Sequence, residues 1–443
     1  MNTEKTNYAP KEFTKMRFDM HVHVGGHGLQ ADDEKNRDDF KKNINLYFNE
    51  PKFRSFFIMA EYYMMERDLA SDSASVNDEG KVTTDAYLEY VYKRLVQSKE
   101  IDSIVLLAMD APFKKDKDGQ YTIDWKHADL LISNKFLSDK VDYLNCRLKC
   151  DGRTDKRFFM AASIHPLRED FLAEMTHIIN NKNVVAVKII PSEFNLDLSS
   201  FPPLYWKILA GNATYKDFQM AETDEIFSHN LTLKLPLILH TGPEYCFEQG
   251  TLKPELNMHE DLKLILKAGV RLIAAHCGAR VFPTDKNHID NFLKLLDIAH
   301  SDNNNWELYG DISGFTFYSR LNILKKLAKQ TPYHKYLLNG TDIPVPVYQS
   351  GWTYKWNLIK EIFFNLWRKH VTAPHHHYKF DSTIIAFASS IFEQFVVSKK
   401  ASTIKNVFDR DVAIKRSYGF LDNNPDNIYT NAGSVLRDPA EVH

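Results

Sequence analysis

The sequence predicts a (β/α)8 TIM barrel, an α/β fold of eight parallel strands, in a chain of 443 residues. Eight short runs rich in apolar and β-branched residues recur along the chain. Most of them are continuously apolar, as expected of strands that are buried on both faces of a parallel sheet. Segments with the apolar spacing of amphipathic helices lie between the runs. Eight such units favour a closed barrel over an open sheet.

The predicted strands follow one another in chain order. The first four runs are MRFDMHV, SIVLLAM, FFMAASI and VVAVKII, which begin at residues 16, 103, 158 and 184. The next four are LPLILH, RLIAAH, WELYGDI and KYLLNGTD, which end at residues 240, 276, 312 and 342. Helical spacing is found in EDLKLILKAG after the fifth run and in IDNFLKLLDIAH after the sixth. The expected barrel therefore spans residues 16–344.

The chain is longer than eight such units require. Residues from about 28 to 98 are too many for one barrel helix, so they predict a helical insertion, with helices over 31–48 and 53–70. Residues 113–157 form a second long connection. Residues 345–443 predict a helical C-terminal extension packed on the barrel. Because barrels of this kind are single domains, the length does not require a further domain.

Composition limits the classes of partner. The chain is 44% hydrophobic and 26% charged, which is ordinary for a folded protein, and its net charge of −2 predicts no binding to nucleic acid or an anionic membrane. The N-terminal segment MNTEKTNYAPKEF lacks the apolar stretch of a secretory signal, and no later apolar run is uninterrupted enough to span a membrane. We expect a cytoplasmic protein that acts on a small molecule.

The stretch FDMHVHVGG places His21 and His23 one residue apart at the end of the first predicted strand. With 18 histidines in the chain, about 0.7 such pairs are expected by chance. A second pair, His375 and His377 in PHHHY, follows a proline and no strand pattern, which predicts a loop. The spacing of two histidines therefore needs support from its surroundings before it indicates a metal site.

That support comes from the ends of the other strands, where barrels of this kind place their active sites. Alternation along a strand puts both histidines of the first pair on one face. Imidazole and carboxylate donors that meet beside an open position fit a catalytic zinc-type site. Singly, each later residue could be a backbone-bonded core histidine or a helix cap. Metal-binding side chains end four predicted strands: His21 and His23, His240, His276 and Asp342.

Taken in order, FDMHVHVGG, SIHP, VKIIP, LILHTG, AAHCG and NGTDIP resemble the signature of the amidohydrolase superfamily. The set is similar to the amidohydrolase family 2 branch, which includes aminocarboxymuconate-semialdehyde decarboxylase, over residues 16–344. The resemblance implies one divalent metal, Zn²⁺ or Mn²⁺, and a homodimer. It also implies that His276 is a catalytic acid or base. Ile190 stands where many hydrolase-like members carry a histidine. The implied metal ligands are His21, His23, His240 and Asp342.

Three further residues have competing interpretations. We expect Lys188, on the fourth strand, to contact the substrate as an ammonium. The alternatives are a structural ion pair or a carbamate bridging two metal ions, which requires a neutral amine. Arg280, four residues after His276, is expected to bind a substrate carboxylate through its planar fork, or else to pair with a neighbouring acid. His165, in SIHP, is either a structural turn residue or a functional one.

These residues together predict a metal-dependent hydrolase of a small-molecule amide, ester or lactone. A metal-activated water would attack, Asp342 would accept its proton, and His276 would stabilise the oxyanion or assist the transfer. Two alternatives remain open. One is a metal-dependent non-oxidative decarboxylase of a small carboxylic acid, and the other is a non-catalytic barrel that binds a metal or a partner protein.

Overall fold

The computed structural model describes most of the barrel region and part of the C-terminal segment. The described residues are 11–25, 83–124, 127–128, 131–213, 234–244, 253–257, 262–281, 287–317, 320–345, 400–421 and 427–441. The two helices expected over 31–48 and 53–70 and the second histidine pair lie outside them.

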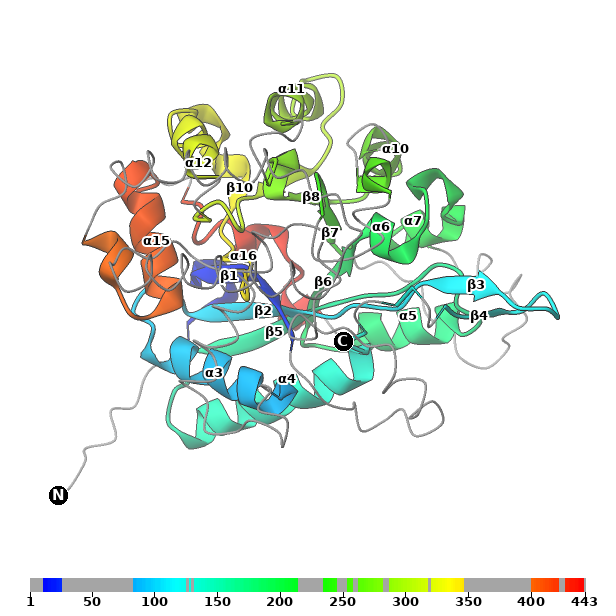
Figure 1. The fold of residues 1–443 in the computed structure, drawn as a ribbon, viewed down its shortest axis with the longest axis horizontal. Helices are drawn as coiled ribbons and strands as arrows, with labels where there is room; N and C mark the ends of the chain where they lie inside the picture. The colour runs from blue at the N-terminus through cyan, green and yellow to red at the C-terminus, as the bar shows by residue number, and fades with distance from the viewer. Residues whose placement is uncertain are drawn as a thin grey trace, which may run out of the picture.

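Eight parallel strands form a nearly closed barrel, which confirms the predicted fold class (Figure 1). Neighbouring strands pair in parallel from the first to the last, and an isolated parallel bridge between Val22 and Ile343 joins the two ends of the sheet. In order around the barrel, the strands are β1 (Phe18–His23), β2 (Ser103–Leu107), β5 (Arg157–Ala162), β6 (Val184–Ile189), β7 (Leu237–His240), β8 (Leu272–Ala275), β9 (Leu308–Asp311) and β10 (Leu337–Leu338).

Helices alternate with the strands and surround them (Figure 1). The helical spacing seen after the fifth and sixth runs corresponds to α10 and α11. The ring consists of α3 (Thr84–Gln97), α4 (Asn134–Cys150), α5 (Phe171–Asn180), α7 (Pro203–Leu209), α10 (Leu262–Lys267), α11 (Ile289–Ala299), α12 (Leu321–Ala328) and α15 (Val407–Tyr418).

Shorter elements lie in the connections and at the chain ends. The long connection 113–157 contains an antiparallel hairpin of β3 (Phe113–Lys115) and β4 (Tyr121–Ile123) before α4. Two short α-helices are α6 (Pro191–Phe194) and α16 (Ala432–Val435). The 3-10 turns are η1 (Phe13–Lys15), η3 (Leu198–Ser200), η4 (Pro254–Asn257), η6 (His276–Gly278), η8 (Thr331–Tyr336), η9 (Ala401–Thr403) and η10 (Pro439–Glu441).

Helix α15 has sequence signals at both ends. The Asn406 side chain accepts hydrogen bonds from the backbone N–H groups of Phe408 and Asp409, which would otherwise lack partners in the first turn. The helix ends at Gly419, which has a φ of 119°, a conformation that a residue without Cβ adopts at little cost. These caps delimit the helix independently of its packing.

Apolar side chains form two layers of core. One layer fills the inside of the barrel, and the other lies between the strands and the surrounding helices. This arrangement buries both faces of each strand and explains why the strands are continuously apolar in sequence. The inner layer includes Phe18, Met20, Val105, Phe159, Ile238 and Ile273.

The C-terminal segment closes the end of the barrel at which the strands begin. Ala432 and Val435 of α16 belong to the inner core layer. Arg437 is 1% exposed, and its guanidinium donates hydrogen bonds to the backbone carbonyls of Ile179 and Val184 beside β6. The carbonyl oxygens thus satisfy buried donors of the guanidinium at this end of the barrel.

The ring of helices includes one helix from the predicted insertion and one from the predicted C-terminal extension. Helix α15 packs against both α12 and α3, so it fills the place between the last and the first helix of the ring. It lies within 345–443, the segment assigned to the extension. Residues 84–97, which were assigned to the insertion, form α3 between β1 and β2. Helices from the predicted insertion and from the predicted extension thus stand in the ring around the strands, and the division into a barrel of residues 16–344 and an extension of residues 345–443 stays a prediction.

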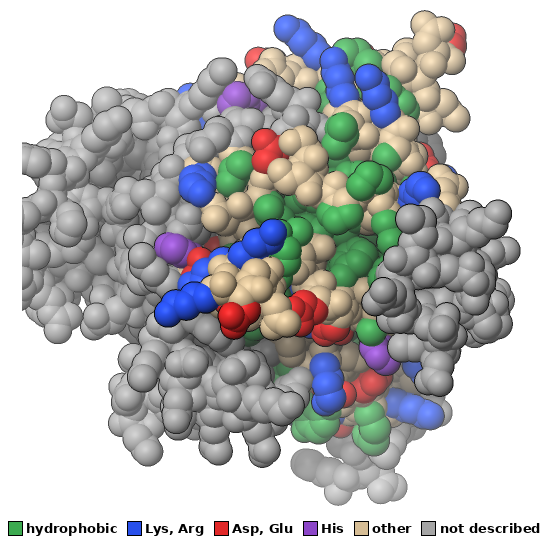
Figure 2. Space-filling view, turned by 90° about the vertical axis from the view of Figure 1, so that its right-hand side faces the viewer, with side chains coloured by type: hydrophobic (Ala, Val, Ile, Leu, Met, Phe, Trp, Pro, Cys, Tyr) green, Lys and Arg blue, Asp and Glu red, His purple; other side chains and the backbone are tan. Residues whose placement is uncertain are grey.

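The face on the right-hand side of Figure 1 is turned toward the viewer in Figure 2. Apolar side chains gather near its middle, and side chains of both charges are interspersed around them (Figure 2). Among the described residues, no helix is long and apolar enough to cross a membrane.

Candidate metal centre

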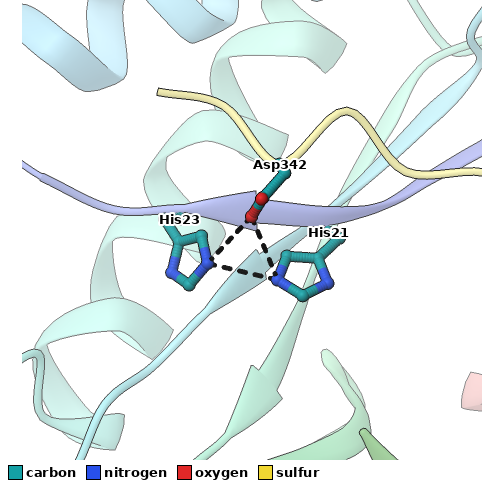
Figure 3. Close-up of side chains that lie close together, drawn as sticks. All are labelled: His21, His23 and Asp342. Atoms are coloured by element: carbon teal, nitrogen blue, oxygen red, sulfur yellow. Dashed lines mark hydrogen bonds and ion pairs between the residues drawn. The ribbon is translucent and has the colours of Figure 1, made fainter. Parts of the chain in front are cut away.

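His21, His23 and Asp342 meet at the end of the barrel where the strands finish (Figure 3). Both histidines belong to β1, and their alternate positions place them on the same side of the strand. Asp342 enters from the loop after β10, and its backbone N–H donates to the carbonyl of His21 at 2.9 Å. The exposed fractions of the three residues are 0%, 4% and 6%. The sequence prediction that these residues converge agrees with this geometry.

The three donor atoms are spaced as the ligands of one small ion would be. The two Nε2 atoms are 3.1 Å apart, and Asp342 Oδ1 lies 3.4 Å from His21 Nε2 and 3.2 Å from His23 Nε2. Ligands at the usual zinc distances occupy tetrahedron corners about 3.3 Å apart. The observed spacings match this value, so the residues present fit a tetrahedral divalent ion.

The tautomer of His21 strengthens the case for a cation. Its Nδ1 hydrogen-bonds to the Asp311 carboxylate of β9, so Nδ1 donates and Nε2 carries a lone pair. That lone pair faces Asp342 Oδ1, which can also only accept while the carboxylate is ionised. Two acceptors at this distance repel each other unless a positive charge lies beside them. The amine of Lys188, 3.4 Å from His21 Nε2, supplies part of that charge, and a metal ion would supply more.

The carboxylates of the centre differ in their proton affinity. Burial raises the pKa of Asp342, but the neighbouring His276, His23 and His21 outweigh burial and hold the pKa well below its usual value. Burial raises the pKa of Asp311 to about 6, against the lowering effect of Lys188. Asp342 is therefore the stronger acid of the two and is anionic at neutral pH, and its role as a metal ligand stays a prediction.

Lys188 of β6 extends to the same centre and is fully buried. Its Nζ lies 3.4 Å from His21 Nε2. Burial lowers the pKa of Lys188 to about 8, although Asp311 and Asp342 act in the opposite direction. The amine is thus mostly charged at neutral pH, with a smaller neutral fraction. The position is compatible with all three interpretations of this residue that the sequence leaves open.

His240 ends β7 next to this group but is not part of its closest set. Its Nε2 is buried, lies 3.6 Å from Glu244 Oε2, and has no hydrogen-bond partner among the described residues. Burial lowers the pKa of His240, and Lys188 lowers it further. A neutral imidazole with a free nitrogen beside the centre is suited to metal binding, so its role as a ligand stays a prediction.

His276 follows β8, and its ring lies between those of two other predicted site histidines. The ring centroids of His21 and His240 are 5.0 and 4.9 Å from it. Its Nδ1 lies 3.1 Å from both the carbonyl oxygen and Oγ of Ser313, and 3.9 Å from Asp342 Oδ2. Burial lowers the pKa of His276, although Asp342 opposes this effect. The predicted acid or base therefore adjoins the metal ligands.

Two other predicted residues have different surroundings. The side chain of Arg280 is partly exposed on the rim after β8, and no described contact connects it to the three ligands, so its role stays a prediction. His165 is fully buried, accepts the N–H of Leu167 at Nδ1 and faces the carbonyl of Phe194 through Nε2. Both of its nitrogens are occupied, which favours the structural interpretation of SIHP.

Residues that the sequence analysis did not select also reach the centre. Asp311 lies one residue before the end of the seventh run and Ser313 directly follows that end, so the rule for strand ends points only to their neighbourhood. Arg320 precedes α12, is 5% exposed and donates from Nε to the carbonyl of Arg280. Burial lowers the pKa of His276, and the charge of Arg320 lowers it further. No motif marks Arg320, so only its place in a loop after a strand could have indicated it.

No protein-family profile matches the sequence, and no curated protein matches it. Solved structures resemble the fold at low identity. An uncharacterised TIM-barrel protein from Bordetella bronchiseptica is 11% identical with a TM-score of 0.41, over 84% of this chain and 99% of that one. A probable 2-pyrone-4,6-dicarboxylic acid hydrolase from Acinetobacter baumannii is 15% identical with a TM-score of 0.35, over 90% and 99%.

IDCase from Metarhizium anisopliae is 14% identical with a TM-score of 0.37, over 92% of this chain and 97% of the other. The barrel itself is established by the strand pairing within this chain. Its chemistry is argued below from the residues of the site, because unrelated activities share this fold.

Proposed function

We propose that this protein is a metal-dependent hydrolase of the amidohydrolase type that cleaves an amide, ester or lactone bond in a small molecule. The observation that carries the proposal is the convergence of the His21, His23 and Asp342 donor atoms within 3.4 Å of one another. Nitrogen and oxygen donors in a buried site suit Zn²⁺, with Mn²⁺ as the alternative. When bound, such an ion supplies Lewis acidity that activates water and polarises a carbonyl group.

The chain's own groups would handle the proton and the developing charge. Asp342 presents Oδ1 to the two histidines and Oδ2 to His276, so a proton accepted by this carboxylate can be passed toward a leaving group. His276, neutral in this buried setting, can donate a hydrogen bond or accept a proton next to it. His240 is proposed as a further ligand, because its buried Nε2 adjoins the same centre.

Lys188 is proposed to contact the substrate. Its charged amine lies beside the ligands inside the barrel, where the low dielectric strengthens its attraction to negative charge. It would stabilise either a substrate carboxylate or an oxyanion that forms during the reaction. Arg280, on the rim, is proposed to bind a substrate carboxylate farther from the reacting bond.

Metal content gives the first test. Protein purified without chelators is expected to contain one equivalent of Zn²⁺ or Mn²⁺ per chain by elemental analysis, and the double variant His21→Ala/His23→Ala is expected to contain almost none. His300→Ala is a matched control, because His300 stacks on Tyr336 at 3.7 Å, away from the centre. Two equivalents in the wild type would instead favour a carbamate on Lys188. No metal after growth in supplemented medium would refute the proposal.

Activity assays then separate hydrolysis from decarboxylation. We expect the metal-loaded protein to hydrolyse a member of a panel of esters, lactones and amides, with oxygen from ¹⁸O-labelled water appearing in the product. Asp342→Asn should abolish that activity. Release of CO₂ without incorporation of ¹⁸O would show that the same ligands serve a decarboxylase. If the wild type shows neither activity and its function is unchanged in Asp342→Asn, the result would support the non-catalytic barrel.

A further inference from the structure

Asp311 and Ser313 contact the Nδ1 atoms of His21 and His276, respectively. Both residues are fully buried and are separated by one residue at the end of β9. The Asp311 carboxylate is saturated by donors. Oδ1 accepts the N–H of Ser313 at 2.7 Å, and Oδ2 accepts the Ser313 hydroxyl at 2.9 Å together with the Nδ1–H of His21.

Ser313 determines how His276 is protonated through two atoms, its hydroxyl oxygen and its backbone carbonyl oxygen. The single hydroxyl proton is given to Asp311, so the hydroxyl oxygen can only accept from His276 Nδ1, which lies 3.1 Å away. The carbonyl oxygen of Ser313 also lies 3.1 Å from Nδ1 and can only accept. Both contacts therefore require a proton on Nδ1 of His276. In the neutral ring, Nε2 is then the nitrogen with the free lone pair.

We propose that Asp311 and Ser313 are paired positioning residues that hold His21 and His276 in the same tautomer, with Nδ1 protonated and Nε2 free. Asp311 fixes the metal ligand, Ser313 fixes the acid or base, and the bond between Ser313 Oγ and Asp311 Oδ2 joins the two. The inference rests on the proposed function for its purpose, but the tautomers follow from hydrogen bonding alone. One short Asp-Ile-Ser segment would thus orient both a metal ligand and an acid or base.

Close packing keeps the segment in one arrangement. A Cβ on Gly340 would lie 2.8 Å from His21 Cβ and 3.0 Å from both Asp311 Oδ1 and Ser313 Cβ. The backbone of the loop after β10 therefore passes directly against the pair and leaves little room for another side-chain rotamer.

The experiment measures tautomers and zinc affinity separately. Side-chain ¹⁵N chemical shifts of histidine-labelled, metal-free protein, recorded at a pH where the imidazoles are neutral, are expected to show Nδ1 protonated and Nε2 bare in both His21 and His276. The Zn²⁺ dissociation constant is measured by competition with a chromophoric chelator. Neither measurement requires a substrate or catalytic activity.

Two variants break the pair in different ways. In Asp311→Asn the amide oxygen is expected to keep the N–H of Ser313, which places the NH₂ against His21 Nδ1, so His21 is expected to move its proton to Nε2. Zn²⁺ affinity should then fall 10- to 100-fold, as when other groups behind metal ligands are removed. Ser313→Ala keeps the carbonyl acceptor, so His276 should retain its tautomer while Zn²⁺ affinity falls by no more than about tenfold.

Asp102→Asn and Ser103→Ala are matched controls. They remove a buried carboxylate and a buried hydroxyl near the start of β2, at the opposite end of the barrel. Neither should change the tautomers or the zinc affinity. A wild-type spectrum with the proton on Nε2 of either histidine would overturn the inference, as would an Asp311→Asn protein with unchanged tautomers and affinity. Failure of the wild type to bind either Zn²⁺ or Mn²⁺ would refute the proposed function, while the spectra would still test the tautomers.

Discussion

Two residues of the candidate site, His276 and Asp342, have left-handed backbone conformations, with φ of 60° and 68°. Residues with a side chain avoid this region because Cβ approaches the backbone carbonyl oxygen. In Asp342 the conformation turns the chain within the loop after β10 and allows its N–H to bond to the carbonyl of His21. The surrounding contacts must offset this local cost, which is a common arrangement at functional sites.

The strain at Asp342 leads to a prediction about stability. Asp342→Gly and Asp342→Ala both remove the carboxylate, but only glycine adopts a φ of 68° without a steric cost. We expect the glycine variant to have a free energy of unfolding about 1 kcal/mol higher than the alanine variant. Urea denaturation of the metal-free proteins would measure the difference.

Thr341, the preceding residue, provides the control, because it is buried and is not among the residues with positive φ. There the order should reverse, with Thr341→Gly less stable than Thr341→Ala by about 0.5 to 1 kcal/mol. If the alanine variant is the more stable one at both positions, the left-handed conformation of Asp342 carries no cost.

At the scale of elements, α15 is joined to the site by the buried amine of Lys415, which also forms an ion pair within the helix. Lys415 donates hydrogen bonds from Nζ to Asp411 Oδ2 at 2.6 Å, to Asn339 Oδ1 at 2.7 Å and to the carbonyl of Gly340 at 2.8 Å. Asn339 and Gly340 precede Asp342 in the loop after β10. The helix therefore satisfies the polar groups of the loop that carries a proposed metal ligand.

Removing the charge of Lys415 should be costly. Lys415→Met leaves Asp411 buried without its counter-ion, and we expect the free energy of unfolding to fall by about 3 to 5 kcal/mol. Arg416→Met is the matched control on the same helix. Its partner Glu100 is partly exposed, so that change should cost less than about 1 kcal/mol. Similar losses in both variants, measured by urea denaturation, would contradict the importance of the buried pair.

At the scale of the molecule, the barrel depends on both ends of its sequence. Phe408 and Val412 of α15 belong to the outer core layer, and Val435 of α16 belongs to the inner one. A chain that ends at residue 344 would lack all three and expose the apolar surfaces they cover. We expect that chain to show no cooperative thermal unfolding by circular dichroism, because the ring and the floor of the barrel are incomplete. A sharp transition at the wild-type temperature would show that residues 345–443 are an independent extension.

Much of the fold was predictable because each strand carries a local signal. Continuous apolar runs follow from burial on both faces, and alternation along β1 placed His21 and His23 together. The rule for strand ends also selected Asp342. It did not select Asp311, which lies one residue before the end of the seventh predicted run, because the apolar Ile312 follows it. Arg320 has no local signal, since its place depends on the path of a loop.

The sequence by itself determined the eight strand and helix units and the chemistry of the residues at the strand ends, because hydrophobic periodicity and side-chain type are local properties. Only the tertiary structure decided which of those residues meet. It placed Asp342 within 3.4 Å of both histidines, set Asp311 behind His21, and brought α15 from the end of the chain between α3 and α12. Those arrangements depend on closure of the barrel and on contacts between residues about 300 positions apart, which no local pattern encodes.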